Sequence, residues 1–162
     1  YLALREAGNA HGLRIFGALA VESMRLEKGY LHWKADILTE FDPFETGLNR
    51  FVKMDKPDFV GKAALAKRQA EGLRKQIVTL TLDSDFAPAH GGASVMVGDK
   101  VVGTVTSGGW GYRLGLNLAY AFVDPDVSKV GTTFEVDVLG QRIAATVSPM
   151  GAYDPTMALV RG

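Results

Sequence analysis

The sequence contains no cysteine, and its three histidines are scattered. Disulfide bonds, thiolate metal ligands and a cysteine nucleophile are therefore excluded, and the histidines match no metal-binding spacing, so we expect no metal site. Lysine plus arginine number 18, as do aspartate plus glutamate, so no net charge attracts the chain to nucleic acid or anionic lipid. No apolar run is long enough to span a membrane, and no signal-peptide pattern opens the chain. We expect neither nucleic acid nor a membrane as a partner.

The remaining composition is that of an ordinary globular protein. With 162 residues, 47% of them hydrophobic and 22% charged, the chain is about one domain long, or two small ones. Its first residue is Tyr1 rather than methionine, and a helical pattern is already present there. We therefore expect the chain to be part of a longer protein whose other residues carry part of the chemistry.

Hydrophobic periodicity in the first half predicts three helices and one strand. The helices are expected over residues 1–11, over residues 18–28 with a stop at Gly29, and over residues 61–71. An imperfect alternation over residues 48–54 predicts the strand. The side chains expected to face inward from the second and third helices are Ala18, Val21, Met24, Ala64, Leu65 and Ala70.

The periodicity changes at Gly72, after which runs of period two replace runs of period 3.6. We therefore expect two domains, residues 1–72 and 73–162, and an α+β fold class. Gly98–Asp99 is a hairpin turn signal, and Gly108–Gly111 is expected to be a flexible loop. Short strands with turns between them favour a small antiparallel barrel or sandwich. The expected strands span residues 77–82, 94–97, 101–106, 117–123, 133–138 and 142–147.

The stretch Met24–Trp33 combines a helix end with an aromatic loop. Arg25 lies one turn before the stop at Gly29, and its planar guanidinium is suited to a carboxylate or a polar heterocycle. Glu22 lies three residues before Arg25, within pairing reach on the same helix face. The alternative to a ligand contact is thus an Arg25–Glu22 ion pair on a solvated helix edge, and spacing alone leaves both open.

Several motifs in this order resemble the folate-binding aminomethyltransferase family, which is the glycine cleavage T-protein family. They are Met24-Arg25-Leu26-Glu27-Lys28-Gly29-Tyr30 followed by Trp33 and Ala35-Asp36, then Pro43–Leu48, Phe59–Leu65 and Gly103–Gly108. The resemblance covers nearly the whole chain. The Glu-Lys-Gly-Tyr and His-Trp pieces are similar to the dimethylglycine and sarcosine dehydrogenase branch of the family.

The resemblance implies a fold and an activity. Residues 1–72 would be the C-terminal part of a folate-binding module, and residues 73–162 a small antiparallel Greek-key β-barrel. The implied reaction passes a one-carbon unit from an aminomethyl or methylamine group to tetrahydrofolate, and FAD would belong only to a separate N-terminal domain. The implied compartment is the cytoplasm, or the mitochondrial matrix in a eukaryote.

The resemblance also implies which partners the chain has and that the catalytic residue lies outside it. The family's acid/base aspartate lies upstream, so we expect no catalytic residue in this chain and no activity from it alone. The expected partners are a small-molecule folate and either the N-terminal part of the same protein or a partner subunit.

Individual residues take implied roles. Arg25 matches the family's substrate-contacting arginine, and Tyr30 is expected to stack on a folate ring. Trp110 lies in a glycine-rich segment that would reach the folate site, and Tyr153 lies near the position of a C-terminal tyrosine of the family. For each of these the alternative is an ordinary packing or surface role. Structural support, rather than ligand contact, is expected from Glu22, Glu27, Asp36 and Glu45.

Two functions of other classes stay open. The alternatives to a one-carbon transfer enzyme are a non-catalytic folate-binding module on the same scaffold and a structural barrel that docks on a partner. An upstream flavin-binding glycine motif would select the dehydrogenase, whereas a short folate module alone would select the aminomethyltransferase.

Overall fold

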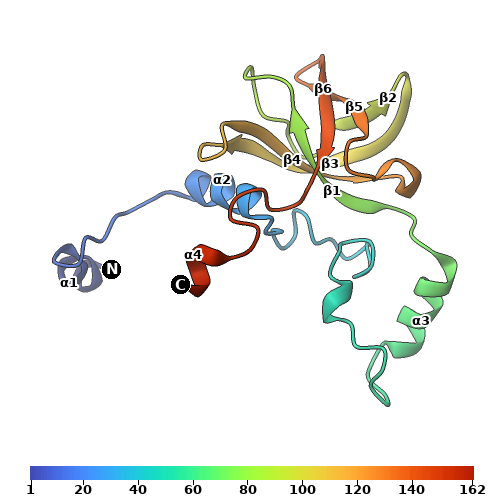
Figure 1. The fold of residues 1–162 in the computed structure, drawn as a ribbon, viewed down its shortest axis with the longest axis horizontal. Coiled ribbons are helices and arrows are strands. Elements are labelled where there is room, and N and C mark those ends of the chain that lie inside the picture. The colour runs from blue at the N-terminus through green and yellow to red at the C-terminus, as the bar shows by residue number, and fades with distance from the viewer.

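The computed structural model describes residues 1–162 and is organised around a closed barrel of six antiparallel strands (Figure 1). The order around the barrel is β1-β4-β3-β2-β5-β6, so β1 pairs with β4 and β6 rather than with β2. This is a Greek-key arrangement. The strands are β1 (Gln76–Leu82), β2 (Ser94–Val97), β3 (Lys100–Gly111), β4 (Leu116–Val123), β5 (Thr133–Val138) and β6 (Gln141–Ser148).

The barrel interior holds a core of 15 buried apolar residues. Alternation places Val78, Leu80 and Leu82 of β1 in this core, as the sequence predicts. Ile77, which precedes Val78, packs instead on the outside, in a second cluster with Leu26 of helix α2. Strand β4 is therefore buried on both faces, because α2 packs against its outer side.

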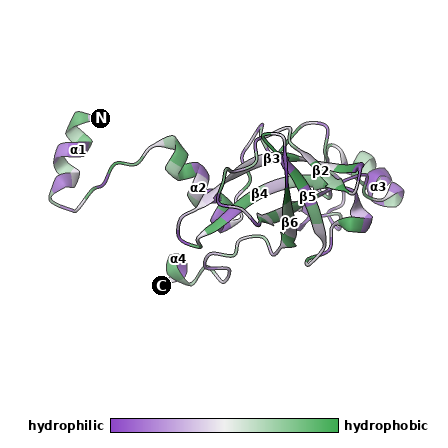
Figure 2. Ribbon diagram, turned by 90° about the horizontal axis from the view of Figure 1, so that it is seen from above, coloured by the Kyte–Doolittle hydropathy of each residue, from purple (hydrophilic) through white to green (hydrophobic).

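The helices lie outside the barrel. They are α1 (Leu2–Asn9), α2 (Ala18–Lys28), α3 (Lys62–Glu71) and the short α4 (Ala158–Arg161), with 3₁₀ turns η1 (Asn49–Phe51) and η2 (Pro125–Val127). Helix α1 extends away from the barrel, and Figure 2 shows apolar residues along it and along the link to α2. Neither α1 nor α3 has a buried residue. None of the helices is both long and apolar enough to cross a membrane.

Two local predictions are wrong. Residues 48–54 form η1 and extended chain rather than a strand, since the closed barrel offers no free edge for pairing. Gly108–Gly111 is not a loop but the end of β3, paired with β4. A glycine is needed at Gly108 because an added Cβ would collide with the Ala89 carbonyl oxygen.

The predicted inward faces of two helices are also wrong. In α3, Ala64 and Ala70 are exposed and Leu65 is only half-buried. In α2, Val21 and Met24 remain 43% and 47% exposed, while Ser23, Leu26 and Glu27 are buried against the barrel. Helix α2 therefore buries a partly polar face and leaves apolar side chains outside.

Candidate functional site

Helix α2 ends where the sequence predicts, at Gly29. This glycine has a left-handed conformation (φ 79°, ψ 27°) that L-residues rarely adopt. An added Cβ would lie 2.8 Å from the backbone nitrogen of Gly151, so the C-terminal segment crosses the helix end in direct contact. The end of α2 and residues 150–157 therefore form one unit, although they are far apart in sequence.

Arg25 is 9% exposed and faces the barrel. Its Nη1 donates to Asp36 Oδ2 at 2.8 Å, its Nη2 to Ser107 Oγ at 2.8 Å, and its Nε to Glu22 Oε2 at 2.7 Å. Nη1 also donates to the Tyr30 carbonyl oxygen at 3.2 Å. The guanidinium is thus held rigidly, and the ion pair with Glu22 coexists with a deeper one to Asp36.

Asp36 is fully buried at the centre of this network. Besides Arg25 it accepts hydrogen bonds from the His32 backbone N–H (2.8 Å), Ser107 Oγ (2.6 Å) and Thr106 Oγ1 (2.5 Å). The carboxylate therefore ties the loop after α2 to strand β3. The ion pair and these hydrogen bonds offset the free-energy cost of burying the carboxylate charge.

Glu27 and Glu45 anchor two other segments. Glu27 Oε1 accepts the backbone N–H groups of Arg113 (2.7 Å) and Leu114 (3.0 Å), which fixes the β3–β4 turn on α2. Burial alone would raise the pKa of Glu45, but hydrogen bonds from the Arg74 side chain and from backbone amides lower it to about 2. Both carboxylates thus accept hydrogen bonds from groups of the protein itself.

Tyr120 of β4 lies beneath the helix end. Its hydroxyl donates to the Leu26 carbonyl oxygen at 3.1 Å, and the Arg25 guanidinium carbon lies 5.8 Å from its ring centroid. Burial raises the pKa of this phenol. Tyr120 thus serves as a neutral support for the Arg25 network.

A cavity of about 390 Å³ opens between the end of α2, the β3–β4 turn and the C-terminal segment. Arg25, Lys28 and Arg113 supply its cationic groups, and Glu27 is its one acidic residue. The apolar and aromatic lining comes from Phe16, Val21, Met24, Tyr30 and Tyr153. A slot of this kind suits a flat aromatic ligand that also carries negative charge.

The structure brings three of the four predicted folate contacts to this cavity. Arg25, Tyr30 and Tyr153 line it, with Tyr30 49% exposed and Tyr153 half-buried. Trp110 lies elsewhere, because its position in β3 directs it to a different cavity beside Asn117. Its backbone carbonyl oxygen accepts a hydrogen bond from Ser23 Oγ (2.6 Å), so it supports α2 from outside the cavity.

The sequence reasoning missed Lys28 and Arg113 as cavity residues. Lys28 Nζ is 2.6 Å from Asp154 Oδ2, and this contact lowers the pKa of Asp154. Both cations also lie near the Tyr153 ring, at 5.7 Å for Lys28 Nζ and 5.4 Å for the Arg113 guanidinium carbon. No local pattern signals this cluster, since residues about 40 and 126 positions apart meet only in the folded chain.

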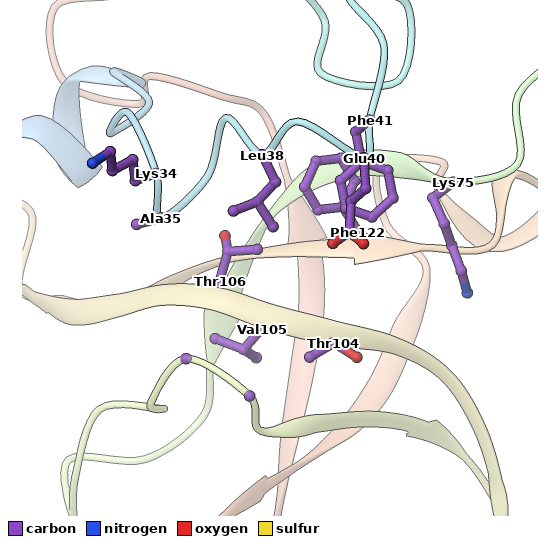
Figure 3. Close-up of a pocket in the computed structure, with 12 residues that line it drawn as sticks. Lys34, Ala35, Leu38, Glu40, Phe41, Lys75, Thr104, Val105, Thr106 and Phe122 are labelled. Atoms are coloured by element: carbon purple, nitrogen blue, oxygen red, sulfur yellow. The ribbon is translucent and has the colours of Figure 1, made fainter.

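A second cavity, of about 440 Å³, lies between the loop at residues 34–41 and strand β3 (Figure 3). The rings of Phe41 and Phe122 stack there with centroids 3.7 Å apart. Lys75 lines the cavity, but its Nζ is paired with Asp124 at 2.6 Å. This cavity contains none of the predicted folate contacts.

Two family models match the chain. The GCVT N-terminal domain matches residues 1–56, and the glycine cleavage T-protein C-terminal barrel domain matches residues 75–154. The chain belongs to the glycine cleavage T-protein family. Family membership and the Greek-key barrel are thus both confirmed, and the barrel matched by the family model is the one that the strands form.

Curated relatives of the chain include dehydrogenases and aminomethyltransferases. The chain is 38% identical over 159 residues to "Dimethylglycine dehydrogenase, mitochondrial" of Rattus norvegicus, covering 96% of the chain and 19% of the relative. It is 38% identical over 152 residues to "Aminomethyltransferase" of Saccharopolyspora erythraea, covering 93% of the chain and 41% of the relative. The chain therefore spans about a fifth to two fifths of the length of these relatives.

A solved structure supports the same conclusion. The glycine cleavage system aminomethyltransferase T from Bartonella henselae superposes with a TM-score of 0.79 at 26% sequence identity. The match covers 84% of this chain and 38% of that one. The chain thus shares the architecture of one part of a T-protein.

Proposed function

We propose that this chain forms one wall of a tetrahydrofolate site in a one-carbon transfer enzyme. The enzyme would be an aminomethyltransferase or the folate half of a dimethylglycine or sarcosine dehydrogenase, which are kinds of relative that the chain matches. The observation that carries the proposal is the cavity at the end of α2, where Arg25, Tyr30 and Tyr153 converge.

The residues of this cavity fit a reduced folate. Folate combines flat rings with a glutamate tail, and the cavity combines two tyrosines and aliphatic side chains with three cations. Its volume of about 390 Å³ is within the usual range for small-molecule sites. Arg25 contributes mainly by fixing the Tyr30 backbone, because each of its nitrogens already has a protein acceptor.

The chain supplies binding and orientation rather than proton transfer. Glu27 is the one carboxylate in the cavity, and its Oε1 is occupied by two backbone amides. Glu27 is also only 2% exposed, so we expect it to hold the β3–β4 turn rather than to transfer a proton. We therefore expect the 162-residue chain alone to give no turnover. The lack of a side chain assigned to proton transfer favours a binding role for this part of the enzyme.

The residues do not fit a flavin. The glycine-rich run Gly103–Gly109 lies inside β3 and pairs with β4, whereas a dinucleotide site needs such glycines between a strand and a helix. Any redox step would belong to another domain.

The proposal is tested by tetrahydrofolate titration of the natural full-length protein. Tyr30→Leu and Tyr153→Leu should each raise the dissociation constant about three- to tenfold, because each removes an aromatic surface. Tyr112→Leu is the matched control, since Tyr112 is 81% exposed and outside the cavity. Equal affinities for all three variants and the wild type would refute the cavity as the folate site.

A further inference from the structure

We infer that Arg113 binds a carboxylate of the ligand and so makes the cavity selective for folates that carry the glutamate tail. This inference rests on the proposed function, because it names the part of the folate that this residue would recognise. It is based on the charges around the cavity, which leave one cation without a carboxylate partner.

Two of the three cavity cations are already neutralised. Arg25 is paired with Asp36 at 2.8 Å and with Glu22 at 2.6 Å. Lys28 is paired with Asp154 at 2.6 Å. Arg113 has no carboxylate within 4.0 Å, and its only side-chain hydrogen bond runs from Nη1 to the Tyr153 hydroxyl at 3.2 Å. Its Nε and Nη2 therefore remain free to donate.

The Arg113 backbone is fixed although its side chain is exposed. The buried Glu27 carboxylate holds the backbone N–H of Arg113 at 2.7 Å and that of Leu114 at 3.0 Å. Gly111 keeps the turn close to this carboxylate, since an added Cβ would lie 2.8 Å from Glu27 Cγ. The fixed backbone therefore places the guanidinium at the rim of the cavity, so less conformational entropy is lost when Arg113 binds a ligand.

The position of Arg113 relative to Tyr153 indicates what it binds. Its guanidinium carbon lies 5.4 Å from the centroid of the Tyr153 ring, which is part of the aromatic lining. A ligand ring placed in the slot would bring an attached acidic group next to this guanidinium. A planar fork with two free nitrogens is suited to a carboxylate, which it can bind in a bidentate manner.

The experiment compares tetrahydrofolate with tetrahydropteroate, which has the same rings but lacks the glutamate. In the natural full-length protein, the wild type should bind tetrahydrofolate about tenfold more tightly. Arg113→Gln should abolish this preference by weakening the binding of tetrahydrofolate but not of tetrahydropteroate. Arg113→Lys, which keeps the positive charge, should retain part of the preference. Because Glu27 binds the backbone of Arg113, neither substitution removes that contact.

Arg142→Gln is the matched control. Arg142 is also an exposed arginine on the barrel, but it contacts Asp99 and Glu135 rather than the cavity. This variant should keep the full preference. If the wild type binds both ligands equally, or Arg113→Gln keeps the preference, the role of Arg113 is overturned while the proposed function stands. If the wild type binds neither ligand, both are overturned.

Discussion

The barrel strands enclose a core of 15 apolar residues, whereas helices α1 and α3 outside the barrel have no buried residue. The residues before the barrel are attached to it by a small apolar cluster around Leu26, by the Phe41–Phe122 stack and by buried carboxylates, with Glu27, Asp36 and Glu45 each at most 2% exposed. The barrel is thus stabilised by its own packing. The preceding part depends on a small apolar cluster and a few polar contacts, and it leaves other apolar side chains free to form a ligand cavity or to pack against further protein.

The largest effect is expected from removing the central polar contact. Asp36→Ala leaves the buried Arg25 guanidinium without its main partner and should destabilise the protein by about 3–5 kcal/mol. Urea unfolding measures this loss. Asp58→Ala is the control, because the Asp58 carboxylate is exposed and accepts only the neighbouring Phe59 backbone N–H. A similar small change in both variants would show that polar anchoring is not what attaches α2.

A slightly smaller effect is expected in the barrel core. Leu80 is fully buried, so Leu80→Ala should cost about 2–5 kcal/mol through lost burial and a cavity. Leu19 in α2 is 86% exposed, and Leu19→Ala should change the unfolding free energy by less than about 0.5 kcal/mol. Paired urea titrations measure both values. A cost for Leu19→Ala comparable to that for Leu80→Ala would contradict the contrast between the two regions.

The smallest effect is expected from Glu45, and it depends on pH. The folded-state pKa of about 2 lies below the ordinary value of 4.5, so the carboxylate contributes stability above pH 4.5 that is lost as the pH falls towards 2. Because its partner Arg74 is 55% exposed, we expect only about 1–3 kcal/mol. The stability gap between wild type and Glu45→Gln, measured by urea unfolding from pH 7 to pH 3, should narrow on acidification. A gap independent of pH would exclude this linkage.

Local patterns predict most of the barrel. Gly98–Asp99 forms the expected turn between β2 and β3, and the alternation of Phe134, Val136 and Val138 correctly predicts their burial in the core. Gly29 ends α2 as expected. These features are local, since a turn or a cap depends on the residues next to it. The same reasoning fails for Gly108–Gly111, whose glycines are required by neighbouring chain rather than by a turn.

The candidate site was less accessible to sequence reasoning. Arg25, Tyr30 and Tyr153 are predicted contacts that the fold brings to one cavity, but Trp110 is not among its lining residues. Lys28 and Arg113 have no distinguishing local pattern, because their importance depends on the C-terminal segment folding back onto α2. Ion pairs between distant residues neutralise Arg25 and Lys28 and leave Arg113 without a carboxylate partner. These pairs are visible only in the three-dimensional structure.

Hydrogen–deuterium exchange on the natural full-length protein, with and without tetrahydrofolate, tests the central claim most directly. We predict slower exchange in peptides covering residues 24–31 and 150–157, which border the cavity at the end of α2. Unchanged exchange in both segments, or protection confined to residues 34–41 beside the Phe41–Phe122 stack, would contradict the placement of the folate site.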